Sequence, residues 1–468
     1  MPNNLNQNSV EAHHKLADEY LAKRDFEQAF EHYQEALKLQ PNSQLIYQHL
    51  GNLKVLQRKV DESINYYDKA LEINTDSTDL SYYYSHYGLS PQKSQVPQQS
   101  QKPIKNDRFP VLLDNPVGKI NLLRNQRTFS FHRSGWKFAI NTLKSLHNSQ
   151  GILLDGFIED TFSWQHYYQG FRPTRILEKM KQDGVFEQLA TSEEKGIIPY
   201  SQPWVGFCHN PPKMPIWFQY QDSLQRIFSK DIWQKSLNHC LGLFSLSEYH
   251  AQWLRETTGK PVSALIHPTE IPEKQFDFDK FIENPHKKII QIGWWLRKLN
   301  AITQLPIPKN NPLNLEKIKL IPKFFDKAND HVRILTGVER NIYRIKIEDI
   351  FLENTKEVDH VSNQEYDELL SQNLAFVSLY DSSANNAVIE CIARATPILV
   401  NPLPAVVEYL GKDYPLYFDN LSEAAEKALN LSLIRDAHNY LKTCDTRTKL
   451  SPEYFLKSFE ESEVYQKI

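Results

Sequence analysis

Polar side chains that follow an apolar segment in the last third of the chain have the types and spacing of an anion site. Residues 378–400 are typical of a strand, a polar loop, a helix, a Thr-Pro turn and another strand. Because ligands of parallel α/β sheets bind beyond the carboxyl ends of strands, the loop residues Asp381, Asn385 and Asn386 are candidates. The helix start favours a diphosphate through its free N–H groups, and Glu390 is placed to accept hydrogen bonds from ribose hydroxyls.

Two basic residues follow a second apolar segment. Residues 289–292 predict a strand that ends at Gly293, and Arg297 and Lys298 come shortly afterwards. Cationic groups stabilise the charge that develops on a departing phosphate, by about 3 kcal/mol for one well-placed donor. We therefore expect Arg297 and Lys298 to face a diphosphate; the alternative is that both are solvated surface charges.

The arrangement of residues 378–400 resembles the donor-binding half of GT-B glycosyltransferases of the "glycosyl transferases group 1" kind. In that family, two glutamates separated by seven residues contact the sugar and the ribose. Here Asp381 takes the first place and Glu390 the second, with one extra residue between them, and Asn385 and Asn386 stand where glycines are expected. The resemblance implies that Asp381 and Asn385 orient the sugar and that Glu390 holds the ribose. The alternative is an ordinary αβ unit.

The same resemblance extends to three other positions. It implies that Gly293 and the basic residues after it contact the donor diphosphate, although the family usually spaces the Arg and Lys further apart. Gly135, which precedes a predicted helix, resembles the glycine-bearing loop that approaches donor and acceptor; a simple helix start is the alternative. His209 follows the strand 204–207 and would lie at the cleft, in contact with the sugar or acceptor, unless its role is structural. Asp155 and Glu159, which follow another strand end, are further candidates to face the acceptor.

Short apolar segments alternate with helix-like periods from about residue 111 onward. This pattern is typical of parallel sheets covered on both faces. The span is too long for one sheet, so we predict an α/β fold with two facing Rossmann-like domains, residues 108–280 for the acceptor and residues 281–468 for the nucleotide-sugar donor. The final stretch, 452–466, is expected to return to the first domain. The predicted strands are 151–155, 204–207, 241–245, 262–266, 288–292, 332–336, 374–379 and 397–400.

The N-terminal region repeats itself with an offset of about 34 residues, which is the tetratricopeptide period. Small residues at matching positions allow two antiparallel helices to approach closely, and a Pro-Asn-Ser turn separates the two units. We predict helical repeats of the tetratricopeptide kind over residues 10–76, followed by a flexible linker over residues 77–107, which is rich in Gln, Ser and Pro. The matching positions are Ala17 with Gly51, Ala29 with Ser63, Tyr33 with Tyr67, and Ala36 with Ala70.

Composition excludes several classes of protein. A formal net charge of -3 gives no general attraction to nucleic acid. No apolar stretch reaches the length of about 20 residues that a bilayer span needs, and the N-terminus lacks a secretory signal. Because the four cysteines are scattered, we expect a reducing, cytoplasmic location without disulfides or zinc. No metal or other cofactor is expected. The Lys-rich stretch 309–327 is interpreted as a solvated insertion.

These observations predict a glycosyltransferase that moves a sugar from a nucleoside-diphosphate sugar to an acceptor hydroxyl. The acceptor, whether glycan, lipid or protein, is left open, and the repeats are candidates for binding a protein partner. If the group 1 resemblance holds, the outcome is retention at the anomeric carbon. One alternative is an inverting protein O-glycosyltransferase, in which repeats are joined to a GT-B body. A second is a non-catalytic scaffold with a degenerate transferase-like body.

Overall fold

The computed structural model describes residues 9–22, 25–43, 113–122, 135–162, 200–218, 222–320, 328–346, 355–358 and 361–468, with scattered residues between 46 and 69. The predicted linker 77–107 lies outside these residues. The chain divides into two compact units, of which the smaller comprises mainly residues 1–91 and the larger most of the remaining chain.

The smaller unit contains an antiparallel helix pair, α1 (Val10–Ala22) and α2 (Phe26–Leu39). Asp25 begins α2, because its side chain accepts a hydrogen bond from the backbone N–H of Gln28. Ala17 on α1 and Ala29 on α2 are fully buried. These small side chains let the helices pack closely, as the repeat pattern predicts.

The larger unit contains two parallel five-stranded sheets, and each sheet with its helices is called a lobe here. The first lobe has the strand order β1-β2-β3-β4-β5. Its core lies on both faces of the sheet, where Phe207 and Phe244 pack on one side and Trp204 and Trp233 on the other. The strands are β1 (Ile120–Asn121), β2 (Ile152–Asp155), β3 (Trp204–Phe207), β4 (Cys240–Ser245) and β5 (Val262–Ala264), and the helices are α6 (Trp136–Thr142), η2 (Leu143–Leu146), α10 (Leu224–Phe228), α11 (Asp231–Leu237) and α12 (Glu248–Thr258).

The second lobe has the strand order β10-β9-β6-β7-β8. The chain enters at the central strand β6 (Lys288–Ile292) and adds β7 (Glu316–Leu320) and β8 (Thr355–Val358) on one side. It then returns to add β9 (Leu374–Val377) and β10 (Ile398–Val400) on the other side. The order therefore reverses between β6 and β9. Ligands of open parallel sheets bind at the carboxyl ends of the strands where such a reversal occurs.

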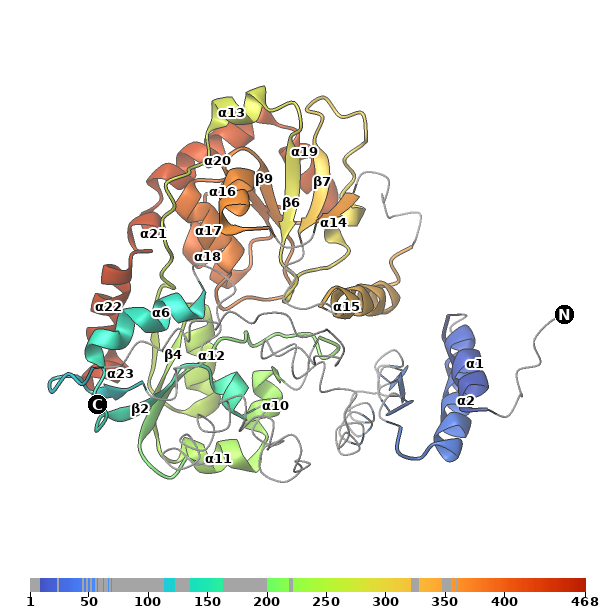
Figure 1. Ribbon diagram of the computed structural model, residues 1–468, viewed down its shortest axis with the longest axis horizontal. Helices are drawn as coiled ribbons and strands as arrows, with labels where there is room; N and C mark the ends of the chain where they lie inside the picture. The colour runs from blue at the N-terminus through green and yellow to red at the C-terminus, as the bar shows by residue number, and fades with distance from the viewer. Residues whose placement is uncertain are drawn as a thin grey trace, which may run out of the picture. The chain divides into compact units, whose positions relative to one another are not determined.

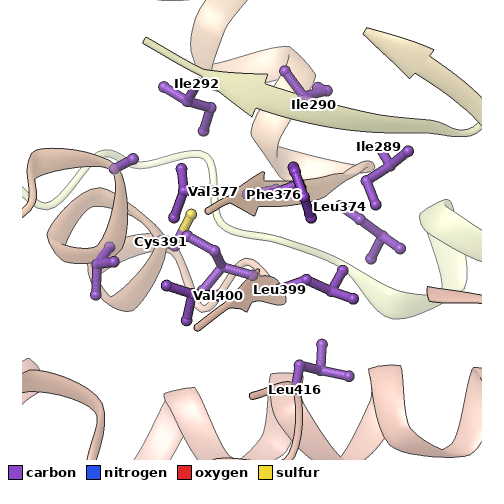
Figure 2. Close-up of a cluster of buried hydrophobic side chains, with 14 of the residues drawn as sticks. Ile289, Ile290, Ile292, Leu374, Phe376, Val377, Cys391, Leu399, Val400 and Leu416 are labelled. Carbon is purple, nitrogen blue, oxygen red and sulfur yellow. The ribbon is translucent and has the colours of Figure 1, made fainter. Parts of the chain in front are cut away.

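A continuous apolar core supports the second sheet. Ile289, Phe376, Leu399 and Leu416 are fully buried in it. Figure 2 draws these side chains around the strands. Strands buried on both faces explain the uninterrupted apolar sequence of β9 and β10. The helices of this lobe are α13 (Phe278–Glu283), α14 (Ala301–Gln304), α15 (Ala328–Tyr343), α16 (Asn363–Ser371), α17 (Asn386–Arg394), α18 (Pro404–Leu410), α19 (Leu421–Ala428), α20 (Leu431–Thr443) and α21 (Asp445–Thr448).

The last two helices belong to the core of the first lobe. Phe455 and Phe459 of α22 (Pro452–Glu460) and Val464 of α23 (Glu463–Gln466) are buried against the first sheet. Figure 1 shows the chain running from the second lobe back to the first through α21, α22 and α23. The expected return of residues 452–466 is observed. The other domain boundaries stay predictions.

Two sequence interpretations are wrong. Residues 332–336 are not a strand but part of α15, in which Val332, Leu335 and Glu339 are buried at helical spacing. The described part of the stretch 309–327 is not a solvated insertion, because it contains the strand β7, while residues 321–327 lie outside the described residues. Lys317 on β7 is fully buried and its Nζ lies 3.2 and 3.1 Å from the carbonyl oxygens of Thr303 and Leu305.

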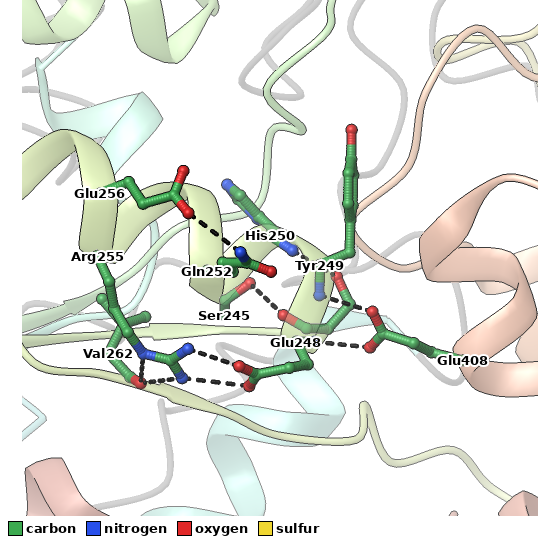
Figure 3. Close-up of polar contacts among 10 residues, drawn as sticks. Ser245, Glu248, Tyr249, His250, Gln252, Arg255, Glu256, Val262 and Glu408 are labelled. Carbon is green, nitrogen blue, oxygen red and sulfur yellow. Dashed lines mark hydrogen bonds and ion pairs between the residues drawn. The ribbon is translucent and has the colours of Figure 1, made fainter.

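Two contacts tie α18 of the second lobe to the first lobe. The Glu408 carboxylate accepts hydrogen bonds of 2.6 Å from the backbone N–H groups of Glu248 and Tyr249, at the start of α12 (Figure 3). A carboxylate at a helix N-terminus is favoured by the helix dipole. The Tyr409 hydroxyl donates to the Leu246 carbonyl at 2.7 Å. Because these three hydrogen bonds cross between lobes, they hold the two sheets in a defined arrangement.

Replacement of Leu399 by Ala is expected to lower the free energy of unfolding by about 2–5 kcal/mol, because it leaves a cavity in the second core. Urea unfolding followed by circular dichroism measures the effect. Leu431→Ala is the matched control, since Leu431 is 37% exposed, and it should change stability by less than about 0.5 kcal/mol. Equal losses in the two variants would contradict this core assignment.

Candidate functional site

The loop after β6 places a guanidinium at the carboxyl end of the central strand. Arg297 is 9% exposed. Its Nε donates to the Ile292 carbonyl at 3.1 Å, and its Nη1 donates to the Trp295 carbonyl at 2.6 Å. Gly293 has φ 74°, a left-handed conformation that favours glycine. A Cβ at Gly293 would lie 3.5 Å from Arg297 Nη2, so the glycine lies directly against the guanidinium.

The loops after β6 and β9 are joined by backbone hydrogen bonds. The N–H of Lys298 donates to the Ser378 carbonyl at 2.7 Å, and the N–H of Tyr380 donates to the Leu296 carbonyl at 3.0 Å. Arg297 and Leu379 form an antiparallel bridge between these bonds. The two loops at the strand-order reversal therefore form one structural unit.

The start of α17 lies next to the Arg297 guanidinium. Asn385 is the N-cap of α17, and its Oδ1 accepts from the Val388 N–H at 3.3 Å and from Arg297 Nη2 at 3.4 Å. Asn386 is the first residue of the helix and is half-buried. The N–H groups of the first helical turn carry partial positive charge. Arg297 and the helix start thus form an electropositive region.

Glu390 belongs to a buried polar network behind this region. Its Oε2 accepts from the Tyr366 hydroxyl at 2.6 Å. Arg394 on the same helix pairs with Asp367 at 2.6 Å, and its guanidinium carbon lies 5.5 Å from the centroid of the Tyr366 ring. Burial lowers the pKa of Arg297 to about 10, while the charge of nearby Glu390 opposes the shift. Arg297 is therefore still a cation at neutral pH.

Asp381 joins the β9 loop to the first lobe. Its Oδ2 accepts from the Lys213 N–H at 2.7 Å and from the Tyr249 hydroxyl at 3.3 Å, and its Oδ1 accepts from the Ser382 N–H at 2.9 Å. Burial raises the pKa of the Asp381 carboxyl. Asp381 thus lies between the lobes. Lys298, by contrast, is exposed, with its Nζ 5.9 Å from the centroid of the Tyr380 ring.

His209 lies at the carboxyl end of β3 in the first lobe. Its ring stacks on Phe157 at 4.2 Å between centroids and meets the edge of Trp136 at 4.4 Å. Burial lowers the pKa of His209 to about 3, so the ring is neutral at pH 7. Nε2 lies 2.9 Å from the Gly156 carbonyl and must donate to it, which leaves Nδ1 as an acceptor.

Glu159 fixes the backbone around His209. Its Oε1 accepts from the N–H groups of His209 and Asn210, both at 2.7 Å. Burial raises the pKa of Glu159 to about 8, so its carboxyl is mainly protonated at neutral pH. Gly135, the N-cap of α6, is buried and precedes Trp136, whose ring contacts His209. Gly135, Glu159 and His209 therefore belong to one region of the first lobe.

Some of the buried polar atoms without hydrogen-bond partners in the described residues belong to side chains near His209 or the β9 loop. These atoms are Trp136 Nε1, Glu159 Oε2, His250 Nε2 and Ser382 Oγ. His250 on α12 reaches across to the second lobe, where its Nδ1 lies 2.8 Å from Ser383 Oγ. A buried polar atom without a partner costs about 1–3 kcal/mol, which a ligand that forms a hydrogen bond with it would recover.

The structure brings most of the predicted residues together. Gly293, Asn385 and Glu390 lie close to Arg297 at the carboxyl end of the second sheet, Asn386 follows Asn385, and Asp381 lies between the lobes. His209 and Gly135 lie in the first lobe. Lys298 alone of the set is exposed. Sequence reasoning missed Tyr366, Lys213 and Tyr249, since a lone Tyr or a backbone N–H carries no local motif. Within the described ranges, no group of three or more His, Cys, Asp or Glu side chains could hold a metal ion.

Comparison with protein families identifies the N-terminal region. One family model described as a tetratricopeptide repeat matches residues 10–43, and a second matches residues 45–77. The N-terminal region is a pair of tetratricopeptide repeats. The predicted repeat pattern is confirmed, and the two matches cover a minor part of the chain. No curated protein matches the chain by sequence.

Several solved structures are similar to the chain. An alpha,alpha-trehalose-phosphate synthase (UDP-forming) from Burkholderia vietnamiensis is 10% identical, with a TM-score of 0.44 over 75% of this chain and 99% of that chain. TarM from S. aureus is 12% identical, with a TM-score of 0.39 over 60% of this chain and 53% of its own. WaaG, a glycosyltransferase involved in lipopolysaccharide biosynthesis, is 13% identical, with a TM-score of 0.38 over 60% and 82%.

The two parallel sheets of the chain, and not these weak similarities, show its fold class. The strand orders of the two parallel sheets agree with the predicted α/β class. In the part of the chain that the structure describes, no helix has the length and apolar character needed to cross a membrane.

The buried imidazole of His250 gives a prediction about pH. Burial lowers its pKa to about 3, from an ordinary value of 6.5. The unfolded chain therefore binds a proton that the folded chain excludes, and the fold loses up to about 1.4 kcal/mol per pH unit as the pH falls below about 6.5. Above that pH, this contribution is constant. Denaturant unfolding of His250→Asn between pH 7.5 and 4.5 should show a shallower acid loss than the original chain.

His286→Asn is the matched control, because His286 is exposed. It should keep the pH dependence of the original chain. An identical acid loss in His250→Asn and the original chain would show that His250 accepts a proton in the folded state.

Proposed function

We propose that the chain is a glycosyltransferase that transfers a sugar from a nucleoside-diphosphate sugar to an acceptor hydroxyl. One observation carries the proposal. The cationic loop after β6, the N-terminus of α17 and the carboxylate of Glu390 converge where the strand order reverses, and the neighbouring loop after β9 contacts the first lobe through Asp381. This is where a parallel sheet binds a nucleotide and where a second lobe can present an acceptor.

The electropositive region suits the departing diphosphate. Three N–H groups of Arg297 are engaged with the protein, and the guanidinium has further donors for phosphate oxygens. The N–H groups of Asn386 and Ala387 add the partial charge of the helix start. Together they stabilise negative charge as the bond from the anomeric carbon to the phosphate breaks. Lys298 is exposed, and its ammonium group would contact the phosphate only if the side chain moved toward it.

The first lobe suits a hydroxyl-rich ligand. His209 offers a neutral acceptor at Nδ1, while the indole N–H of Trp136 is a donor without a partner. Glu159 Oε2 can donate or accept when its carboxyl is protonated. Ser382 Oγ, which lies on the β9 loop of the second lobe, can also donate or accept. A sugar supplies both donors and acceptors, and it would satisfy these buried atoms.

Asp381 is proposed to fix the sugar end of the site relative to the first lobe. Three hydrogen bonds already occupy its carboxylate. A carboxylate has about four lone-pair positions, so roughly one remains for a sugar hydroxyl. Asn385 is proposed to orient the sugar beside it, and Glu390, which Tyr366 holds in place, to accept from ribose.

Retention at the anomeric carbon is the stereochemical outcome that we propose, from the group 1 resemblance. An inverting protein O-glycosyltransferase remains the second candidate, because tetratricopeptide repeats precede the two lobes. In that case the repeats would bind the protein substrate. The configuration of the product formed from a labelled donor distinguishes the two.

The direct test is a thermal-shift screen of UDP-, GDP- and ADP-sugars, followed by a transfer assay with the sugar that binds. Ligand binding to the folded state raises the melting temperature. The proposal expects one nucleotide class to raise it. A non-catalytic scaffold would show no shift with any of them and no transfer.

Glu390→Gln is expected to weaken donor binding by more than about tenfold, which is about 1.4 kcal/mol. The reason is that the amide NH2 group of glutamine takes the place of one carboxylate oxygen. The side chain then has one acceptor instead of two to share between the Tyr366 hydroxyl and the ribose. Isothermal titration calorimetry measures the affinity. Glu426→Gln on α19, an exposed position, is the control and should bind like the original chain. Unchanged affinity in Glu390→Gln would remove Glu390 from the site.

Asp381→Asn is expected to lower kcat at least about tenfold, while the affinity for the nucleoside diphosphate alone changes by less than about threefold. The Asp381 carboxylate contacts the first lobe and does not contact Arg297. Its loss should therefore impair the positioning of the sugar and acceptor more than the binding of the nucleotide. Steady-state kinetics and calorimetry separate these effects. Asp419→Asn, at an exposed position, is the control. Equal losses in kcat and nucleotide affinity would contradict the assignment.

A further inference from the structure

A buried carboxylate outside the predicted site contacts both loops of the strand-order reversal. Glu339 on α15 is 1% exposed. Its Oε1 accepts from the Leu299 N–H at 2.9 Å and from the Tyr380 hydroxyl. Its Oε2 accepts from the N–H of Asn300 at 2.7 Å and from Asn300 Nδ2 at 2.6 Å. One side chain thus receives four hydrogen bonds.

The donors to Glu339 come from both loops that carry the candidate site. Leu299 and Asn300 directly follow Arg297 and Lys298, and Tyr380 directly precedes Asp381. The Glu339 contacts lie beside the backbone bonds between the same loops, from Lys298 to Ser378 and from Tyr380 to Leu296. The carboxylate therefore fixes where the cationic loop lies relative to the acidic loop.

Only a carboxylate satisfies this environment. All four partners donate, and an ionised carboxylate only accepts. A glutamine would turn its NH2 group toward two of the donors and leave buried N–H or O–H groups unpaired. Two cations lie nearby. Burial lowers the pKa of Lys319 on β7, which is 3% exposed, and the charges of Glu357 and Glu339 oppose this shift. Arg340 donates from Nη2 to Asn300 Oδ1 at 3.3 Å.

We propose that Glu339 is a positioning residue for donor binding, which rests on the proposed function. It holds the Arg297 loop and the Asp381 loop at the spacing that lets one diphosphate sugar contact both. It touches neither the nucleotide nor the sugar. The alternative is a local anchor that holds α15 to the lobe and has no effect on ligand binding.

The experiment combines hydrogen–deuterium exchange with calorimetry on the full chain. The variants are Glu339→Gln and Tyr380→Phe, and the matched control is Glu357→Gln. Glu357 on β8 also lies near Lys319, at 3.7 Å, but its side chain is 47% exposed and contacts neither loop. UDP, GDP and ADP are the probes for binding.

Glu339→Gln should raise amide exchange at residues 296–300 and 378–381 by at least about tenfold, while exchange in β4 and β10 stays unchanged. Affinity for the nucleotide that binds the original chain should fall about tenfold. Tyr380→Phe, which keeps three of the four bonds, should change both quantities less. Glu357→Gln should match the original chain.

Two results would overturn the proposal. One is unchanged exchange in either loop of Glu339→Gln, which would show that the carboxylate does not couple them. The other is faster exchange in both loops with undiminished nucleotide affinity, as expected for a local anchor. If the original chain binds none of the three nucleotides, the proposed function itself fails, and the role of Glu339 in binding fails with it; exchange then still reports whether the loops are coupled.

Discussion

The candidate site depends on the buried guanidinium of Arg297 at the reversal of strand order. Arg297 lies over Gly293 after β6 and reaches the N-cap Asn385 before α17, so it connects the two loops that the topology brings together. Taking a guanidinium out of water is costly unless hydrogen bonds compensate for the lost hydration. Here carbonyl oxygens of Ile292 and Trp295 do so, and the loops keep the cation in place.

The first lobe contacts the loop after β9, which carries Asp381 and Ser383. Asp381 accepts from Lys213 and Tyr249, and His250 contacts Ser383. Away from the site, Glu408 binds the start of α12. These contacts are polar and exchangeable, unlike the apolar cores on either side. Met214 and Phe218 of the first lobe also pack in one apolar cluster with Leu296 of the second, so the lobes are joined by both polar and apolar contacts.

The sequence predicted those strands and helices whose pattern of apolar and polar residues matches the side chains that are buried in the structure. Strands β9 and β10 are continuous apolar segments, and Asn385 caps the start of α17. The strand β7 was missed because Lys317 and Lys319 indicate a solvated surface; their burial depends on contacts from the chain around Thr303 and from α15. Residues 332–336 were assigned to a strand because a short apolar segment does not distinguish a strand from a buried helix.

The site was predictable where it follows strand ends and not where it depends on distant partners. Arg297 and Asp381 lie in the loops that follow predicted strands, and Glu390 lies on the helix that begins after the second of these loops, so their common edge could be inferred. The contacts of Tyr366 with Glu390 and of Glu339 with the Arg297 loop join residues more than one element apart. No spacing in the sequence encodes these pairs, since they depend on how the helices pack on the sheet.

A structure of the chain determined with bound UDP, GDP or ADP tests the central claim most directly. The account predicts that diphosphate oxygens lie within hydrogen-bond distance of the Arg297 guanidinium and of the backbone N–H groups of Asn386 and Ala387, with the ribose at Glu390. A nucleotide bound elsewhere on the chain, with Arg297 making only its contacts to the protein, would contradict it.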